Sequence, residues 1–199
     1  MGNLATAPIL FLGSNPSIGT DHEYPSSLAP DVEIESFFTD HFGNGSKEWT
    51  RDGVSVVGTD GKARKVWHWT QVKKRAMELL ESGDVTAGVD YALSEVVHCK
   101  SKSEKGVKEA VDECASRYLY RLVADSGAKV VVSLGRTAER TVRQMFLIPD
   151  ETKVHGPVQL RGRKRWFAFL PHPSARVSDV SFEGNLSPVE LRQLRSYLK

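Results

Sequence analysis

With 199 residues, the chain is long enough to bury the core of one domain, and it contains no repeat or linker that would separate two folding units. Hydrophobic residues make up 40% of it and charged residues 26%, and no apolar run approaches the roughly 20 residues of a membrane helix. The net charge of +2 is too small to identify a partner, and Met1–Pro8 lacks the features of a secretion signal. We therefore expect a single cytoplasmic domain over residues 1–199 that acts as a monomer without membrane contact.

The first predicted element is a buried strand over Pro8–Leu12, a continuous apolar run that ends at Gly13. The stretch between residues 18 and 70 predicts loops and short elements, with a hairpin at Asp60-Gly61. A helix follows, with Thr70 as its N-cap. Its inward face is formed by Val72, Ala76 and Leu79.

A second buried strand is predicted over Asp90–Val97. The helix after it shows apolar residues every three to four positions, which predicts an inward face made of Val107, Val111, Cys114, Tyr118 and Leu122. Lys129–Leu134 and Trp166–Leu170 predict two further strands, which end at Gly135 and Pro171. The capping box at Ser187–Glu190 begins a C-terminal helix.

Strands that alternate with helices predict an α/β domain with a central, mainly parallel four-stranded sheet flanked by helices. In such sheets, ligands bind at the carboxyl ends of the strands. The segments that follow those ends should therefore converge, although they lie far apart in the sequence. They are Gly13–Ser17, the region of Glu95, Gly135–Thr137 and His172–Ser174.

Four segments carry a further pattern: ILFLGSNPS at Ile9–Ser17, ALSEVVHCK at 92–100, KVVVSLGRTAERT at 129–141 and FLPHPSAR at Phe169–Arg176. Together they resemble the uracil-DNA glycosylase superfamily. The first and last resemble its two active-site motifs, the first being closest to the mismatch-specific branch, and the middle two are similar to strands of the iron–sulfur branch. The resemblance implies a DNA glycosylase that flips a nucleotide out of DNA and hydrolyses the bond between base and deoxyribose.

In this interpretation, Asn15 and His172 are the catalytic residues. The amide oxygen of Asn15 would hold the attacking water, and an imidazole N–H of His172 would stabilise the negative charge that develops on the leaving base. Both residues also have purely structural interpretations, because asparagine before proline is a common turn residue and a histidine can cap the end of a strand.

Substrate and DNA contacts are assigned around this pair. Gly13, Ser14, Pro16 and Ser17 would bind the substrate, with Ser17 and Ser174 near the phosphates that flank the flipped nucleotide. Arg176 occupies the region where relatives insert a side chain into the emptied base stack. Lys153–Arg165 carries five basic residues and no acid, so Arg163 and Lys164 are candidate DNA contacts, although such clusters are commonly a solvated face. One aromatic residue must cover the base, and Tyr24 is a candidate, although packing is the simpler interpretation of Tyr24, as it is of Trp67 and Trp69.

The chain departs from the iron–sulfur branch in its cysteines. Relatives in that branch carry four, and this chain aligns only with the last two, Cys99 and Cys114. Because the first strand already begins near Ile9, we expect no upstream segment that supplies the missing pair. The sequence therefore predicts neither an iron–sulfur cluster nor any other metal or cofactor, and its two cysteines are interpreted as free thiols.

A second departure concerns the base. Alignment with that branch places Glu95 where uracil-cleaving members have the asparagine that reads the base. An ionised carboxylate accepts hydrogen bonds only, which would suit the exocyclic amine of a cytosine and repel O4 of uracil. The selected base would then be a damaged or modified pyrimidine, for instance a modified cytosine in invading phage DNA. The alternative is that Glu95 is a buried protonated carboxyl or a structural ion-pair partner.

Three other functions stay open from the sequence. The chain could be a uracil-DNA glycosylase that reads its base through backbone groups of Ser14–Ser17, or a DNA-binding member of the superfamily that has lost turnover. It could also be an unrelated nucleotide-binding protein with a phosphate loop at Gly13–Ser17, although the glycine and lysine spacings of known phosphate loops are missing.

Overall fold

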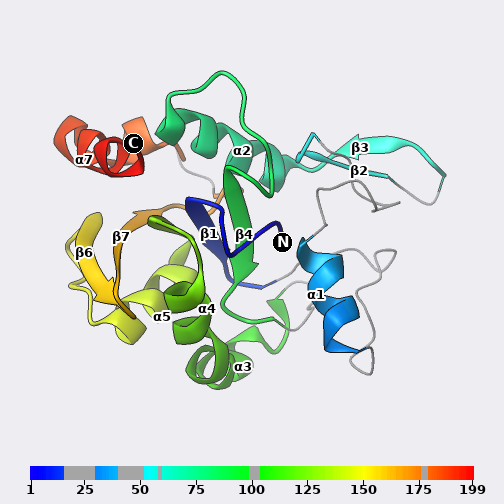
Figure 1. Ribbon diagram of the computed structural model, residues 1–199, viewed down its shortest axis with the longest axis horizontal. Helices are drawn as coiled ribbons and strands as arrows, with labels where there is room; N and C mark the ends of the chain where they lie inside the picture. The colour runs from blue at the N-terminus through cyan, green and yellow to red at the C-terminus, as the bar shows by residue number, and fades with distance from the viewer. Residues whose placement is uncertain (16–29, 40–51, 58–59, 99–103, 176–178) are drawn as a thin grey trace.

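The predicted apolar strands form the centre of the molecule, which a computed structural model describes over residues 1–15, 30–39, 52–57, 60–98, 104–175 and 179–199 (Figure 1). Five strands make one sheet in the order β4-β1-β5-β7-β6. The strands are β1 (Ile9–Gly13), β4 (Tyr91–Glu95), β5 (Val130–Leu134), β6 (Val154–Leu160) and β7 (Arg163–Leu170). The first four strands of that order run parallel, as predicted, and β6 pairs antiparallel with β7.

The fifth strand, β6, was absent from the sequence-based prediction of a four-stranded sheet. Its pairing with β7 shifts register between His155 and Val158, at the Gly156-Pro157 step. This irregularity hides the alternation of apolar and polar residues by which a half-exposed strand is recognised. Proline is tolerated there because β6 is the outer strand of the sheet.

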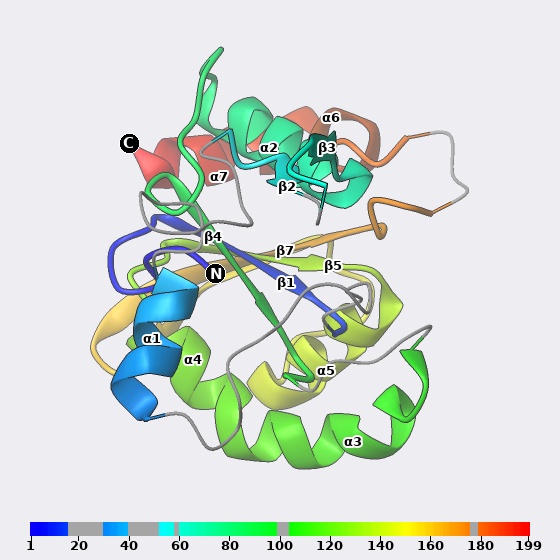
Figure 2. The same cartoon turned by 90° about the vertical axis from the view of Figure 1, so that its right-hand side faces the viewer.

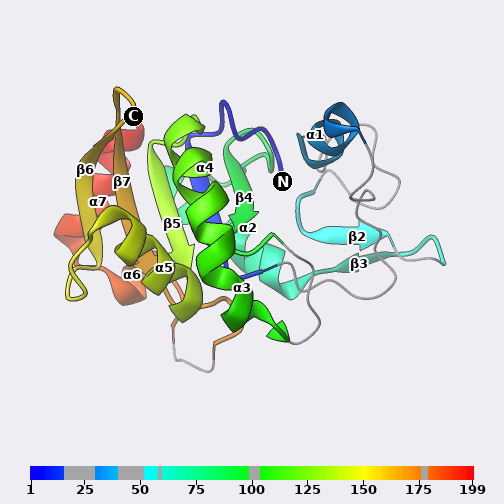
Figure 3. The ribbon, with the colours of Figure 1, turned by 90° about the horizontal axis from the view of Figure 1, so that it is seen from below.

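Helices cover both faces of the sheet (Figures 2 and 3). One face is covered by α2 (Trp67–Leu80), α6 (Phe182–Asn185) and α7 (Pro188–Leu198). The other carries α3 (Val107–Cys114), a π-helical turn (Ala115–Leu119), α4 (Tyr120–Asp125) and α5 (Arg136–Phe146). The helix α1 (Asp31–Thr39) and the hairpin of β2 (Ser55–Val57) and β3 (Ala63–Lys65) lie toward the β4 edge (Figure 1). The predicted hairpin at Asp60-Gly61 is thus confirmed.

The π-helical turn corrects the predicted inward face of the long helix. Val107 and Cys114 are buried as expected, but Tyr118 is 47% exposed, and Leu119 and Val123 take the inward positions. A π-helical turn inserts one residue into the helix, so every side chain after it is rotated relative to an uninterrupted α-helix. The periodicity in the sequence is therefore out of step with the structure from residue 118 onwards.

The N-caps of α7 and α2 were predicted from the sequence, and only that of α7 is confirmed. The Ser187–Glu190 capping box of α7 is present as predicted. By contrast, α2 begins three residues before Thr70, whose hydroxyl donates to the carbonyl of Val66 within the first turn. The predicted inward residues of α2 are buried, as is Trp69, whereas Trp67 is exposed.

Candidate active site

The carboxyl ends of the four parallel strands meet at one edge of the sheet. Glu95 ends β4 and pairs with Gly13 at the end of β1, and Ser14 and Asn15 follow directly. On the other side of β1, Gly135 follows β5, and His172 comes two residues after the end of β7. The structure therefore brings together the segments whose convergence the sequence predicted.

Two glycines, one at the end of β1 and one directly after β5, leave room for the side chains of Glu95 and His172. A Cβ atom on Gly13 would lie 2.1 Å from Oε2 of Glu95, and one on Gly135 would lie 2.9 Å from Cβ of His172. Gly135 also has a φ of 87°, which a larger residue rarely adopts. Glu95 and His172 thus lean over the two strands between them from opposite sides.

Ser14 and Asn15 are both buried, and Ser14 contacts an acidic residue, Glu104, that was not predicted from the sequence. The hydroxyl of Ser14 lies 3.1 Å from Oδ1 of Asn15 and 3.1 Å from Oε1 of Glu104. Glu104 precedes α3 and has a φ of 57°. It lies among lysines and serines in the sequence, a composition typical of a solvated loop, so no local pattern distinguishes it.

The loop after β7 fixes which nitrogen of His172 can donate. The backbone N–H of Ser174 donates to Nδ1 of His172 at 3.1 Å. Burial lowers the pKa of His172, and the negative charge of Glu104 opposes that shift. A neutral imidazole whose Nδ1 accepts a hydrogen bond carries its proton on Nε2, so the donor is Nε2–H.

The first turn of α2 supports this loop. The ring of His68 lies 5.2 Å from that of His172, measured between centroids, and the indole N–H of Trp67 donates to the carbonyl of Pro173 at 3.3 Å. Burial, together with the neighbouring His172, lowers the pKa of His68 to about 4. His68 is therefore uncharged at neutral pH and adds no positive charge beside His172.

Glu95 is in an environment that favours its neutral form. Burial raises its pKa to about 8, against a smaller opposing effect of the Met1 amine. Its side chain keeps some exposure, but Oε2 is buried and has no hydrogen-bond partner among the described residues. This corresponds to the buried protonated carboxyl that the sequence left open, and it differs from the ionised acceptor on which the cytosine interpretation depended.

A family model for the uracil DNA glycosylase superfamily matches residues 1–187 of the sequence. The chain belongs to this superfamily. Its members are in general DNA glycosylases and act on DNA, although some are non-catalytic. A search of curated proteins found no match. Among the described residues, no helix is long and apolar enough to cross a membrane.

The remaining residues predicted to contact DNA or substrate differ in where they lie. Arg163 and Lys164 begin β7, whereas His172 follows its far end, so about seven strand residues at ~3.3 Å each separate them from the site. Arg163 donates to the carbonyl of Ser126 instead. Ser174 is exposed at the site. Outside the described residues lie Pro16, Ser17, Tyr24, Cys99 and Arg176.

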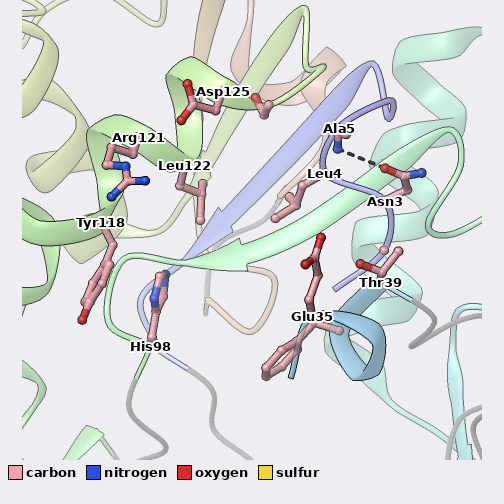
Figure 4. Close-up of a pocket in the computed structure, with 13 residues that line it drawn as sticks. Asn3, Leu4, Ala5, Glu35, Thr39, His98, Tyr118, Arg121, Leu122 and Asp125 are labelled. Carbon is pink, nitrogen blue, oxygen red and sulfur yellow. Dashed lines mark hydrogen bonds between the residues drawn. The ribbon is translucent and has the colours of Figure 1, made fainter. Parts of the chain in front are cut away.

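Two other features of this superfamily member lie apart from the strand ends. A cavity of about 740 Å³ runs between the N-terminal segment, α1 and the helix that contains Tyr118 (Figure 4). The rings of His98 and Tyr118 stack within it with their centroids 5.3 Å apart, and neither Asn15 nor His172 lines it.

Cys114 is buried in the helical core, and the described residues contain no group of three His, Cys, Asp or Glu side chains placed to hold a metal ion.

Proposed function

We propose that the protein is a monofunctional DNA glycosylase that hydrolyses the N-glycosidic bond of a flipped pyrimidine nucleotide and leaves an abasic site. The observation that carries this proposal is the hydrogen bond from Ser174 to Nδ1 of His172, because it assigns the proton to Nε2 at the same sheet edge as Asn15. The superfamily match supports the reaction class, and the geometry supports the assignment of roles within it.

The proposed reaction separates charge between sugar and base. As the bond from C1′ to the base nitrogen breaks, its electron pair leaves with the base, and positive charge grows on the sugar. Nε2–H of His172 donates to the carbonyl oxygen of the leaving pyrimidine and stabilises its negative charge. Removal of such a donor typically costs about 10²–10³ in rate.

Asn15 would position the water. Its amide oxygen accepts a hydrogen bond from the water whose oxygen bonds to C1′, and the water then loses a proton to solvent or to the departing base. An amide has no titratable proton near neutral pH, so Asn15 orients the nucleophile without acting as a strong general base. We expect slower turnover than a carboxylate at this position would give.

Glu95 would read the base. A neutral carboxyl group has one O–H donor and one carbonyl acceptor, the same pair of functions as the amide of asparagine. It can donate to O4 and accept from N3–H of uracil, or accept from the N4 amine and donate to N3 of a cytosine. The raised pKa of Glu95 therefore favours uracil as a second candidate substrate beside the damaged or modified cytosine.

The test is to incubate the purified protein with uracil-containing duplexes and with bacterial and phage DNAs of varied base content, and to identify the released bases by mass spectrometry. We expect a pyrimidine to be released, with strand breaks only after alkali treatment. His172→Ala should serve as the matched inactive control. Absence of any released base would overturn the proposal in favour of a DNA-binding role, and trapping of an enzyme–DNA adduct with borohydride would exclude the monofunctional mechanism.

A further inference from the structure

The hairpin of β2 and β3 leads directly into the first residue of α2, beside the candidate active site. It projects from the body of the domain on the side of β4 (Figures 1 and 3). β3 ends at Lys65, and α2 begins two residues later at Trp67. The indole N–H of Trp67 donates to the carbonyl of Pro173 at 3.3 Å, and Pro173 directly follows His172. Trp67 therefore connects the hairpin to the loop that carries His172.

Trp67 combines an anchored indole N–H with an exposed ring. Its side chain is 61% exposed, although tryptophan carries one of the largest apolar surfaces of any residue. Because the N–H is bonded to Pro173, the part of Trp67 that remains for a ligand is the apolar ring system. Aromatic rings presented in this way stack on nucleobases regardless of sequence, since every base has a π-face. Extrusion of a nucleotide from DNA leaves such base faces unstacked beside the gap.

β3 carries positive charges that nearby acids do not neutralise. Its three residues are all exposed. Arg64 pairs with Asp60 at 2.8 Å, and the carboxylate of Asp52 accepts two backbone N–H groups and one hydroxyl from the start of β2. Lys62 and Lys65 are exposed, and neither forms an ion pair with any residue that the structure describes. These two ammonium groups are therefore available to DNA phosphates.

We propose that the β2–β3 hairpin and Trp67 form a DNA-binding arm, in which Lys62 and Lys65 contact phosphates and the ring of Trp67 stacks on a base exposed beside the flipped nucleotide. This inference rests on the proposed function, because it places that nucleotide at the strand ends near His172. The phosphate contacts hold the duplex without reading its sequence, and the stacked ring adds a contact that salt does not screen. The bond from Trp67 to Pro173 aligns the arm with the loop of His172.

The lysines are tested by the salt dependence of DNA binding. The probe is a short fluorescein-labelled duplex with one tetrahydrofuran residue as an abasic-site analogue, and fluorescence anisotropy gives Kd at several salt concentrations. The slope of log Kd against log salt is about 0.9 for each phosphate contacted, so Lys65→Ser should lower it by about 0.9 and Lys62→Ser/Lys65→Ser by about 1.8. The matched control is Lys164→Ser, which removes an exposed lysine at the opposite end of the sheet from His172 and should leave the slope unchanged. An equal loss of slope in Lys164→Ser and Lys65→Ser would overturn the arm, because it would show a response to net charge alone.

Trp67 is tested on the same duplex. Trp67→Ala should raise Kd about tenfold at every salt concentration and leave the slope unchanged, since loss of one stacked base weakens binding by about 5- to 150-fold. Trp67→Phe keeps a ring that can stack but loses the N–H, so it should keep most of the affinity. Tyr118→Ala, which removes an exposed aromatic residue from the opposite face of the sheet, is the control and should bind as wild type. A Trp67→Phe variant as weak as Trp67→Ala would overturn the stacking role, because the bond to Pro173 would then explain the whole effect.

These measurements do not depend on turnover, because the analogue has no base to release. Unchanged slopes in the lysine variants, with melting temperatures equal to wild type, would overturn the arm whatever the assay of base release shows. Variants that change the oligomeric state and leave DNA binding intact would also overturn it and would identify Trp67 as a protein contact. A wild type that binds the duplex through the arm but releases no base would overturn the proposed hydrolysis alone.

Discussion

At the scale of single residues, the proposed role of Glu95 as the base-reading group makes its protonation decide which bases the site would pair with. Its pKa of about 8 means that the neutral form, which can donate to O4 of uracil, is lost as the pH rises through that value. We expect kcat/KM for uracil to fall between pH 7 and pH 9 relative to an amine-bearing cytosine substrate. Glu95→Gln keeps a donor and an acceptor at every pH, so its ratio should stay constant. A ratio that changes equally in both proteins would exclude Glu95 as the base-reading group.

The same shift predicts how stability depends on pH. The pKa of Glu95 is raised from 4.5 to about 8 on folding, so between these values the folded chain holds a proton that the unfolded chain releases. The contribution of Glu95 to the free energy of unfolding therefore decreases as the pH rises from 4.5 to about 8. Urea denaturation at pH 5 and pH 8 should show that Glu95→Gln gains stability relative to wild type at the higher pH. An equal difference at both pH values would contradict the assigned shift.

His172 is expected to contribute to turnover rather than to folding. His172→Ala should lower kcat by about 10²–10³, because the leaving base loses its donor, and should leave the melting temperature nearly unchanged for this half-buried side chain. His68→Ala removes a neighbouring ring without that donor and is the matched control. If both variants lose the same activity, the Nε2–H of His172 is not the decisive group.

At the scale of elements, Arg143 connects α5 to the turn before β6 and to β7. Its side chain is 5% exposed; it donates to Glu139 and to the carbonyls of Pro149 and Thr152. Its guanidinium lies 3.7 Å from the centroid of the Phe169 ring. This role of Arg143 could not be predicted from the sequence, because an arginine on an amphipathic helix usually faces solvent.

We expect Arg143→Met to lower the free energy of unfolding by about 3 kcal/mol, since methionine fills the volume but leaves the partner oxygens without a donor. Arg140→Met, on the exposed side of the same helix, is the control and should change it by less than about 0.5 kcal/mol. Chemical denaturation at neutral pH measures both. Equal effects of the two substitutions would show that the buried contacts of Arg143 are not stabilising.

At the scale of the whole molecule, we expect folding and catalysis without a metal ion. Cys114 is buried among apolar side chains, which leaves Cys99 as the other thiol of the sequence. Two thiols cannot complete a four-thiolate cluster or a closed zinc site. Treatment with a chelator should leave the melting temperature and the rate of base release unchanged. Stoichiometric iron or zinc in the purified protein would contradict this prediction.

The sheet could be predicted from the sequence because its four parallel strands are continuous apolar runs separated by helices. That alternation admits few topologies, and glycine or proline marks the end of most of these strands. The edge strand β6 could not be predicted, since the Gly156-Pro157 step interrupts its pattern. The π-helical turn, which rotates Tyr118 outward, could not be predicted either, because no local sequence pattern marks it.

The site could be predicted only where its residues follow strands. Asn15 and His172 come after predicted strand ends and Glu95 lies near the end of a predicted strand, so the topology alone places them at one edge. Glu104 and His68 reach the same place from a turn and from a helix, and only the path of the chain in three dimensions brings them there. The protonation of Glu95 likewise follows from burial, which sequence patterns do not quantify.

The strand order fixes the distance between the strands on either side of β1 and β5, and this distance limits how specificity can change. The strand β4, which carries Glu95, and the strand β7, after which His172 follows, are separated by two others, and at ~4.8 Å per strand the backbones of β4 and β7 lie about 14 Å apart. This span is fixed by main-chain hydrogen bonds, so no single side-chain replacement can widen or narrow it. If Glu95 reads the base and His172 donates to the leaving group, as proposed, exchange of the residue at position 95 would change base pairing while the donor stays in place. The sheet thus keeps the spacing of the two strands constant, while the side chain at position 95 can be exchanged.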